Sequence, residues 1–142
     1  MKDIYRNIYI NQTPMIHTTI ASAEMIKYAS NSFLALKISY INEIANLCET
    51  VNADVHTVAR AMGIDGRISP KFLHAGPGFG GSCFPKDVKA LASLAKLKKT
   101  PMHTLDGAIK ANELQKEKMI DKLRSLLGGN FRGKHIAILG LT

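Results

Sequence analysis

The residue of this chain with the clearest chemical potential is Cys83. It stands between a glycine-rich loop, residues 76–81, and a helix that we expect to open at Pro85. The unpaired amides of a helix N-terminus and the nearby ammonium of Lys86 both stabilise a thiolate, the nucleophilic form of cysteine. Asp87, one turn further, can accept a proton or position water. The pattern favours Cys83 as a candidate nucleophile, with a structural thiol as the alternative.

The glycine-rich loop has the letters of a nucleotide-binding motif. Gly76, Gly78 and Gly81 satisfy G-x-G-x-x-G, the dinucleotide fingerprint. That fingerprint requires a preceding strand and a surrounding βαβ unit, and the sequence predicts neither around this loop. We therefore interpret the loop as bare backbone that can approach a ligand closely, with a flexible connector as the alternative.

Other polar residues carry weaker signals. Lys27 and Asn31 are spaced i,i+4, so they project from one face of an expected helix, where such a pair is most often solvated surface. Cys48 lies inside the same helix and is interpreted as a packed core thiol. The five histidines are scattered singly, and no zinc-ligand spacing or P-loop is present, so we expect no metal site.

Composition narrows the class of protein. The chain has 142 residues, of which 46% are hydrophobic, and this suits one globular domain. We expect no membrane span and no signal peptide. Two cysteines make no disulfide framework, which favours a reducing, cytoplasmic compartment. The net charge is +8, but only 6% of residues are aromatic and basic residues alternate with acidic ones, which argues against nucleic-acid binding.

The element that must position Lys27 and Asn31 is a long helix. Residues 23–51 contain neither Gly nor Pro and repeat apolar side chains at helical spacing, with Ser22 as the expected N-cap. Such a helix is too long for one side of a small core. It suggests a spine that is shared with another domain or subunit.

Three shorter helices and one strand complete the expected order. Asp54 opens a helix that Gly63 ends, and further helices are expected over residues 85–97 and 104–127. Residues 134–140 are predicted as a short buried strand, for which the rest of the chain offers no partner. The predicted fold class is mainly α, with a terminal strand that belongs to a truncated α/β domain.

Several of these segments together resemble the UDP-glucose/GDP-mannose dehydrogenase family. The most specific is the block over residues 78–87, and residues 23–31, 42–44 and 63–68 agree with it. The resemblance covers nearly the whole chain. It implies that residues 21–130 form the helical central domain, through which members of this family dimerise.

The resemblance also implies what lies on either side. Residues 1–20 match the exit from an NAD-binding Rossmann domain, and residues 131–142 match the first strand of a nucleotide-sugar-binding domain. The expected ligands are a UDP-sugar substrate and NAD, the latter held mainly by the missing domain. The expected partner is a second copy of the chain.

Individual residues take on roles from the same resemblance. Cys83 matches the nucleophile that holds the sugar C6 carbon first as a thiohemiacetal and then as a thioester. Lys27 matches a residue that stabilises negative charge at the C6 oxygen, Asn31 matches its hydrogen-bonding partner, and Asp87 matches a carboxylate that orients water and the lysine. Arg67 matches an arginine that reaches the substrate across the dimer interface.

The glycine-rich loop matches substrate-binding backbone in the family. Cys83 and Lys86 also match a segment near the nicotinamide of the cofactor. Besides Lys27, Asn31 and Arg67, the expected substrate-binding residues are His74, Ala75, Gly76, Pro77, Gly78, Phe79 and Gly80.

Two further interpretations stay open at this point. One is a non-catalytic helical dimerisation module, and the other is a family member that acts on GDP-mannose or a UDP-N-acetylhexosamine. Because the NAD fingerprint and most of the nucleotide-binding residues are missing from these 142 residues, we expect the isolated chain to be inactive.

Overall fold

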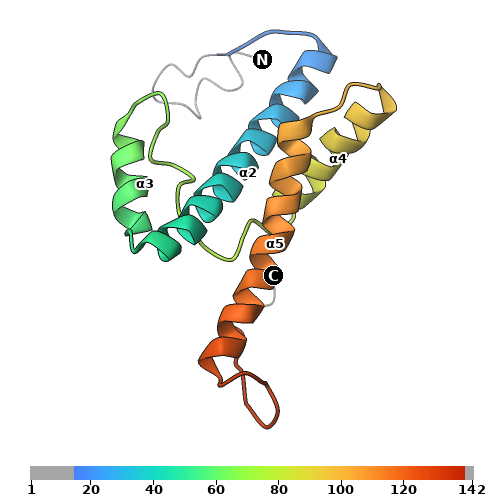
Figure 1. Cartoon of the computed structure of the whole chain (residues 1–142). Coiled ribbons are helices and arrows are strands. Elements are labelled where there is room, and N and C mark those ends of the chain that lie inside the picture. The colour runs from blue at the N-terminus through green and yellow to red at the C-terminus, as the bar shows by residue number, and fades with distance from the viewer. Residues whose placement is uncertain (1–14, 140–142) are drawn as a thin grey trace.

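Within residues 15–139, which the computed structural model describes, the chain folds into four helices. They are α2 (Ile20–Val51), α3 (Val55–Ile64), α4 (Cys83–Leu97) and α5 (His103–Leu126). Figure 1 shows α4 and α5 lying along α2, α3 folded back beside the end of α2, and the last turns of α5 projecting beyond the other helices. The mainly α class expected from the sequence is confirmed.

The terminal strand predicted over residues 134–140 is wrong in the part of that segment that the structure describes. This part has no regular secondary structure, and Ile138 and Leu139 are exposed. A strand persists only when a neighbouring strand completes its main-chain hydrogen bonds, and the described residues contain no such neighbour. Residues 1–14, most of the expected exit segment, lie outside the described residues.

The helix α2 begins three residues before its predicted start. Thr19, whose backbone is extended, is the N-cap, and its side-chain oxygen accepts the N–H of Ser22 at 3.2 Å. Ser22 was expected to be the cap and is instead the amide donor, an error that arises because a hydroxyl at either position can cap. At the other end, Asn52 adopts a left-handed conformation with φ of 55°, and its N–H bonds to the carbonyl of Cys48.

The core lies where α2, α4 and α5 meet. Small residues on α2 let the helices approach closely, and the hydroxyl of Ser39 on α2 donates to the carbonyl of Ala108 on α5 at 2.9 Å. Burial of each large apolar side chain contributes about 1.5–3 kcal/mol. The central cluster includes one residue of the glycine-rich loop and consists of Ala35, Phe79, Val88, Leu91, Ala92 and Leu105.

Gly63 has a different role from the one predicted. Asp54 caps α3 as expected, since its carboxylate accepts the N–H groups of the first turn. The helix, however, continues past Gly63 to Ile64, and Gly63 is buried. A Cβ atom at this glycine would lie 2.7 Å from the Cα of Pro70. The position therefore requires glycine for close packing and not for ending the helix.

The other two helices differ from prediction only at their ends. α4 begins at Cys83, two residues before the expected start at Pro85, and the proline sits in the first turn, where its missing N–H costs no hydrogen bond. α5 begins and ends one residue earlier than predicted. Gly128 and Gly129 follow it with φ of 79° and 95°, as expected for a helix stop.

The two helical glycines make a matched pair for a stability test. Gly107 in α5 is exposed, and a Cβ there would meet nothing within 4 Å. Gly107→Ala is expected to raise the free energy of unfolding by about 0.5–1 kcal/mol, because alanine has the higher helix propensity. Gly63→Ala is expected to lower it by about 1–3 kcal/mol through overpacking against Pro70.

Urea unfolding followed by circular dichroism measures both changes. An equal gain in the two variants would contradict the close packing of Gly63 against the loop after α3.

Candidate active site

The centre of the candidate site is the carboxylate of Asp87 on α4. Its side chain is fully buried, and its Oδ2 accepts hydrogen bonds from Lys27 Nζ and Asn31 Nδ2, each at 2.6 Å. Lys27 and Asn31 lie one turn apart on α2 and share a face, as their spacing predicts. That face packs against α4, so the interpretation of the pair as solvated surface is corrected.

The electrostatics of this cluster keep both partners ionised. Hydrogen bonds from Lys27 and then Asn31 hold the pKa of Asp87 below its ordinary value of 3.8, against the opposing effect of burial. The hydrogen bond to Asp87 raises the pKa of Lys27 above 10.5, and the charges of Asp87, Tyr28 and Cys83 act in the same direction. The Lys27 side chain is 56% exposed, so water screens the pair. The clearest effect of the ion pair is to hold the Lys27 ammonium in one place.

Cys83 belongs to the same cluster. It is the first residue of α4 and is exposed, so its thiol stands at the helix N-terminus, as predicted from the sequence. Asp87 lies four residues further on, so both side chains project from one face of α4. The structure therefore joins Lys27, Asn31 and Asp87 by hydrogen bonds and places Cys83 one turn before Asp87 on α4.

The second oxygen of Asp87 is left without a hydrogen bond. Oδ1 is buried and has no hydrogen-bond partner among the described residues. The ammonium of Lys86 lies 3.8 Å from Oδ1, on a side chain that is 69% exposed. Because Oδ1 has almost no accessible surface, a water molecule or a substrate hydroxyl reaches it only if neighbouring side chains move.

The glycine-rich loop runs beside this cluster, anchored by one aromatic ring. Phe79 is buried, and its ring meets that of Phe84 edge-on at 6.3 Å. Because its N–H and carbonyl also bond to Asn112, neither the ring nor these main-chain groups of Phe79 are free for a ligand. Of the other predicted loop residues, the exposed ones are His74, Pro77 and Gly80, and the half-buried ones are Ala75, Gly76 and Gly78.

Three carboxamides that the sequence analysis did not select hold this loop. Asn42 on α2 accepts the N–H of Gly76, while Gln115 and Asn112 on α5 bond to main-chain groups of the loop. Asn42 was noted only as part of a resemblance. Asn112 and Gln115 could have been selected from their spacing. They are three residues apart on the apolar stripe of α5, where a polar side chain is expected to be buried and to need a hydrogen-bond partner.

Arg67 is not part of the cluster. Its side chain is 91% exposed, and its guanidinium binds the carboxylate of Asp65 in the same turn, with Nη2 at 2.6 Å from Oδ2. This ion pair lowers the pKa of Asp65 and raises that of Arg67. Arg67 therefore does not contact the cluster of its own chain. Its predicted role, to reach the substrate across a dimer interface, stays a prediction.

Two further observations limit what the described residues can bind. No three histidine, cysteine, aspartate or glutamate side chains among residues 15–139 come together in a metal-binding arrangement. None of the helices in that range combines the length and the apolar character that crossing a membrane requires.

Comparison with known proteins decides the family. Residues 21–114 match the central domain of the UDP-glucose/GDP-mannose dehydrogenase family. The chain belongs to this family. The resemblance noted in the sequence is thereby confirmed.

Individual family members match all or nearly all of the chain. It is 52% identical over 142 residues to a UDP-glucose 6-dehydrogenase of Rhizobium meliloti (strain 1021), which covers 100% of this chain and 32% of that protein. It is 53% identical over 129 residues to the UDP-glucose 6-dehydrogenase TuaD of Bacillus subtilis (strain 168), covering 91% of this chain and 28% of that protein.

A solved family structure has the same fold. This UDP-glucose dehydrogenase from the hyperthermophilic archaeon Pyrobaculum islandicum superposes with a TM-score of 0.82 at 36% identity, over 89% of this chain and 29% of that one. The chain spans about a third of the length of the relatives it matches.

The Lys27–Asp87 pair of this family member predicts how stability depends on pH. Because the pKa of Asp87 is lower in the folded chain than in the unfolded one, the carboxylate stabilises the fold above pH 3.8, and this is lost as pH falls through the folded pKa. Asp87→Asn is expected to lower the free energy of unfolding near neutral pH. The difference from wild type should shrink below pH 3.8.

Urea unfolding at about pH 7 and about pH 3 measures this difference. Glu117→Gln, which changes an exposed carboxylate on α5, is the control and should shift stability by less than about 0.5 kcal/mol at either pH. A constant difference between Asp87→Asn and wild type would show that the ionisation of Asp87 does not support the fold.

Proposed function

We propose that the chain is the central domain of an NAD-dependent UDP-glucose 6-dehydrogenase and carries the residues that act on the sugar C6. The observation that supports this most is the joining of Lys27 and Asn31 to the buried Asp87 beside the exposed Cys83. In this proposal residues 21–130 are the central domain, residues 1–20 leave an NAD-binding domain, and residues 131–142 enter a nucleotide-sugar-binding domain. Both cysteines are free thiols, in keeping with a cytoplasmic enzyme.

This chain would form only one side of the cofactor site. Residues 15–139 form helices and loops without a βαβ unit, so a dinucleotide needs a further domain. Cys83 and Lys86, at the exposed N-terminus of α4, are the residues that would face its nicotinamide. NAD, when bound there, supplies a hydride acceptor, and two equivalents are used for each sugar.

The chain's own residues account for the covalent part of the reaction. After the C6 alcohol has lost a hydride and a proton, the Cys83 thiolate adds to the aldehyde carbon, and the carbonyl electron pair moves to oxygen. The Lys27 ammonium, held by Asp87, stabilises that oxygen. Loss of a second hydride leaves a thioester. Water then attacks the carbonyl, the carbon–sulfur bond breaks, the thiolate leaves, and the product is UDP-glucuronate.

Water for this last step would be oriented by Asp87. One carboxylate oxygen is committed to Lys27 and Asn31, and the other has no hydrogen-bond partner among the described residues. Because this second oxygen is buried, it would accept a hydrogen bond from water once neighbouring side chains move, while the first oxygen holds the lysine. The glycine-rich loop would bind the sugar through its main chain.

A chimera tests the proposed activity. Residues 1–142 replace the matching third of the Rhizobium meliloti enzyme, and NADH formation is followed with UDP-glucose. The chimera is expected to turn over, and the isolated chain is not. Cys83→Ser is expected to reduce turnover by at least about a thousandfold, since removal of a nucleophile stops the covalent route.

Cys48→Ala, a change to the buried thiol of α2, is the control and should keep activity in the chimera. GDP-mannose and UDP-N-acetylglucosamine are assayed in parallel, because relatives with other substrates are the second candidate function. A folded but inactive chimera would favour the dimerisation module, and full activity of Cys83→Ser would overturn the covalent mechanism.

We also infer that the enzyme is a homodimer through α2. The helix has 32 residues, and apolar side chains at every seventh position are left exposed: Ile26 (50%), Phe33 (61%), Tyr40 (48%) and Leu47 (59%). A seven-residue apolar repeat forms a continuous stripe along a helix and suits packing against an identical helix. The second copy of the chain is the partner that this stripe fits.

Analytical ultracentrifugation of the chain tests this inference. Phe33→Asp places a charge in the middle of the stripe and is expected to weaken the dimer by at least about tenfold in Kd, or 1.4 kcal/mol. The helical content should be unchanged because Phe33 lies outside the core. Leu126→Asp, at an exposed position on α5, is the control and should not affect association. An unchanged dimer in Phe33→Asp would place the interface elsewhere.

A further inference from the structure

The glycine-rich loop is held by buried side chains at four main-chain groups. The N–H of Gly76 donates to Asn42 Oδ1 at 2.7 Å, and the carbonyl of Gly76 accepts from Gln115 Nε2 at 2.8 Å. The N–H of Phe79 donates to Asn112 Oδ1 at 2.7 Å, and its carbonyl accepts from Asn112 Nδ2 at 3.1 Å. Asn112 thus pairs with Phe79 as one strand residue pairs with another.

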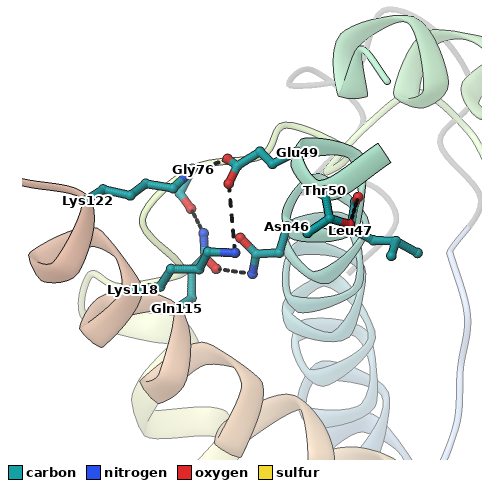
Figure 2. Close-up of polar contacts among 8 residues, drawn as sticks. All are labelled: Asn46, Leu47, Glu49, Thr50, Gly76, Gln115, Lys118 and Lys122. Atoms are coloured by element: carbon teal, nitrogen blue, oxygen red, sulfur yellow. Dashed lines mark hydrogen bonds and ion pairs between the residues drawn. The ribbon is translucent and has the colours of Figure 1, made fainter. Parts of the chain in front are cut away.

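The three carboxamides are buried, and one of them is held by a further side chain. Asn42 and Asn112 are each 2% exposed and Gln115 is 5% exposed. Asn46 Nδ2 on α2 donates to Gln115 Oε1 at 2.9 Å, which turns the Nε2 of Gln115 toward Gly76. Figure 2 shows Gln115 between Asn46 and Gly76. The hydrogen bonds therefore connect α2, α5 and the loop in one buried polar network.

Ion pairs between α2 and α5 lie at the outer edge of this network. Glu49, one turn beyond Asn46 on α2, forms ion pairs with Lys118 and Lys122 of α5, as Figure 2 shows. These side chains are partly exposed, so their pairing contributes little by itself. They join α2 to α5 next to the hydrogen bond between Asn46 and Gln115.

Asn112 also dictates the conformation at Gly78. This residue has φ of 117°, and a Cβ there would lie 2.6 Å from Asn112 Oδ1. The side chain that holds Phe79 therefore excludes any side chain at Gly78. The loop takes one path, with the carboxamide of Asn112 filling the space beneath it.

Holding the loop in this way determines which of its groups remain for a ligand. The main-chain groups of Gly76 and Phe79 are occupied. The N–H groups of Gly78, Gly80 and Gly81 donate no hydrogen bond within the part of the chain that the structure describes. These free amides are donors suited to the hydroxyl and carboxylate oxygens of a sugar.

We propose that Asn42, Asn112 and Gln115 are positioning residues of the dehydrogenase, which fix the loop so that its free glycine amides meet the sugar. Only the identity of the ligand rests on the proposed function, since the hydrogen bonds to the loop belong to the fold. A loop that is already ordered loses little entropy when it binds. Release of the loop should therefore weaken substrate binding more than it slows the chemistry.

The first test is hydrogen exchange of the 142-residue chain. Asn112→Leu and Gln115→Met remove the loop contacts with side chains of similar size. The two hydrogen-bonded amides of the loop, those of Gly76 and Phe79, are expected to exchange at least about tenfold faster. Ser39→Ala is the matched control, because Ser39 is 2% exposed and bonds α2 to α5 without touching the loop. It should leave loop exchange unchanged. Unchanged loop exchange in both folded test variants would overturn the proposal.

The second test places the same variants in the chimeric enzyme. The KM for UDP-glucose is expected to rise about tenfold in Asn112→Leu and Gln115→Met, with a change in kcat of less than about threefold, and Ser39→Ala should alter neither. Faster loop exchange with unchanged KM would reduce the carboxamides to a structural role and overturn the proposal. An inactive parent chimera would count against the proposed function alone, since the exchange result is independent of activity.

Discussion

The buried carboxylate of Asp87 has to be paired, and this requirement determines how α4 lies on α2. An ionised group with a fully buried side chain is tolerated only where charges and hydrogen-bond donors surround it. Both donors come from α2, where Lys27 and Asn31 are one turn apart. Because Cys83 is one turn from Asp87 on α4, pairing the carboxylate also fixes where the N-terminus of α4, which carries the thiol, lies relative to α2. Packing of the apolar core holds the helices together, and this polar contact selects their register.

The sequence was sufficient for most of the fold because its signals there are local. A stretch over residues 23–51 without Gly or Pro predicts one long helix, and the Asp54 cap predicts the next. The errors arose where one residue type serves two purposes. Gly63 could end a helix or allow close contact, and only the position of Pro70 decides between them. The strand predicted at residues 134–140 failed for a related reason, since a strand depends on a neighbour that local pattern does not supply.

The site was predictable only in part because its contacts are long-range. Cys83 could be selected from the sequence because it lies between a glycine-rich loop and the start of a helix. The partner of Lys27 and Asn31 lies 60 and 56 residues away, so their i,i+4 spacing alone is that of any solvated pair. Asn112 is harder still to find, because a lone amide on an apolar stripe becomes informative only when the loop that it holds is seen. Family resemblance supplied the first group and was silent on the second.

One helix carries both the proposed site and the proposed interface. Along α2, Lys27 follows Ile26, and Asn42 comes two residues after Tyr40, so residues that face α4 and the loop alternate with residues of the exposed stripe. A helix is stiff along its axis, and a rotation or slide imposed on one face moves the other equally. Association through the stripe would therefore hold the donors to Asp87 and to the loop in register. On this argument the proposed dimer would do more than bring two sites together, because packing of α2 against its copy would make each site more rigid.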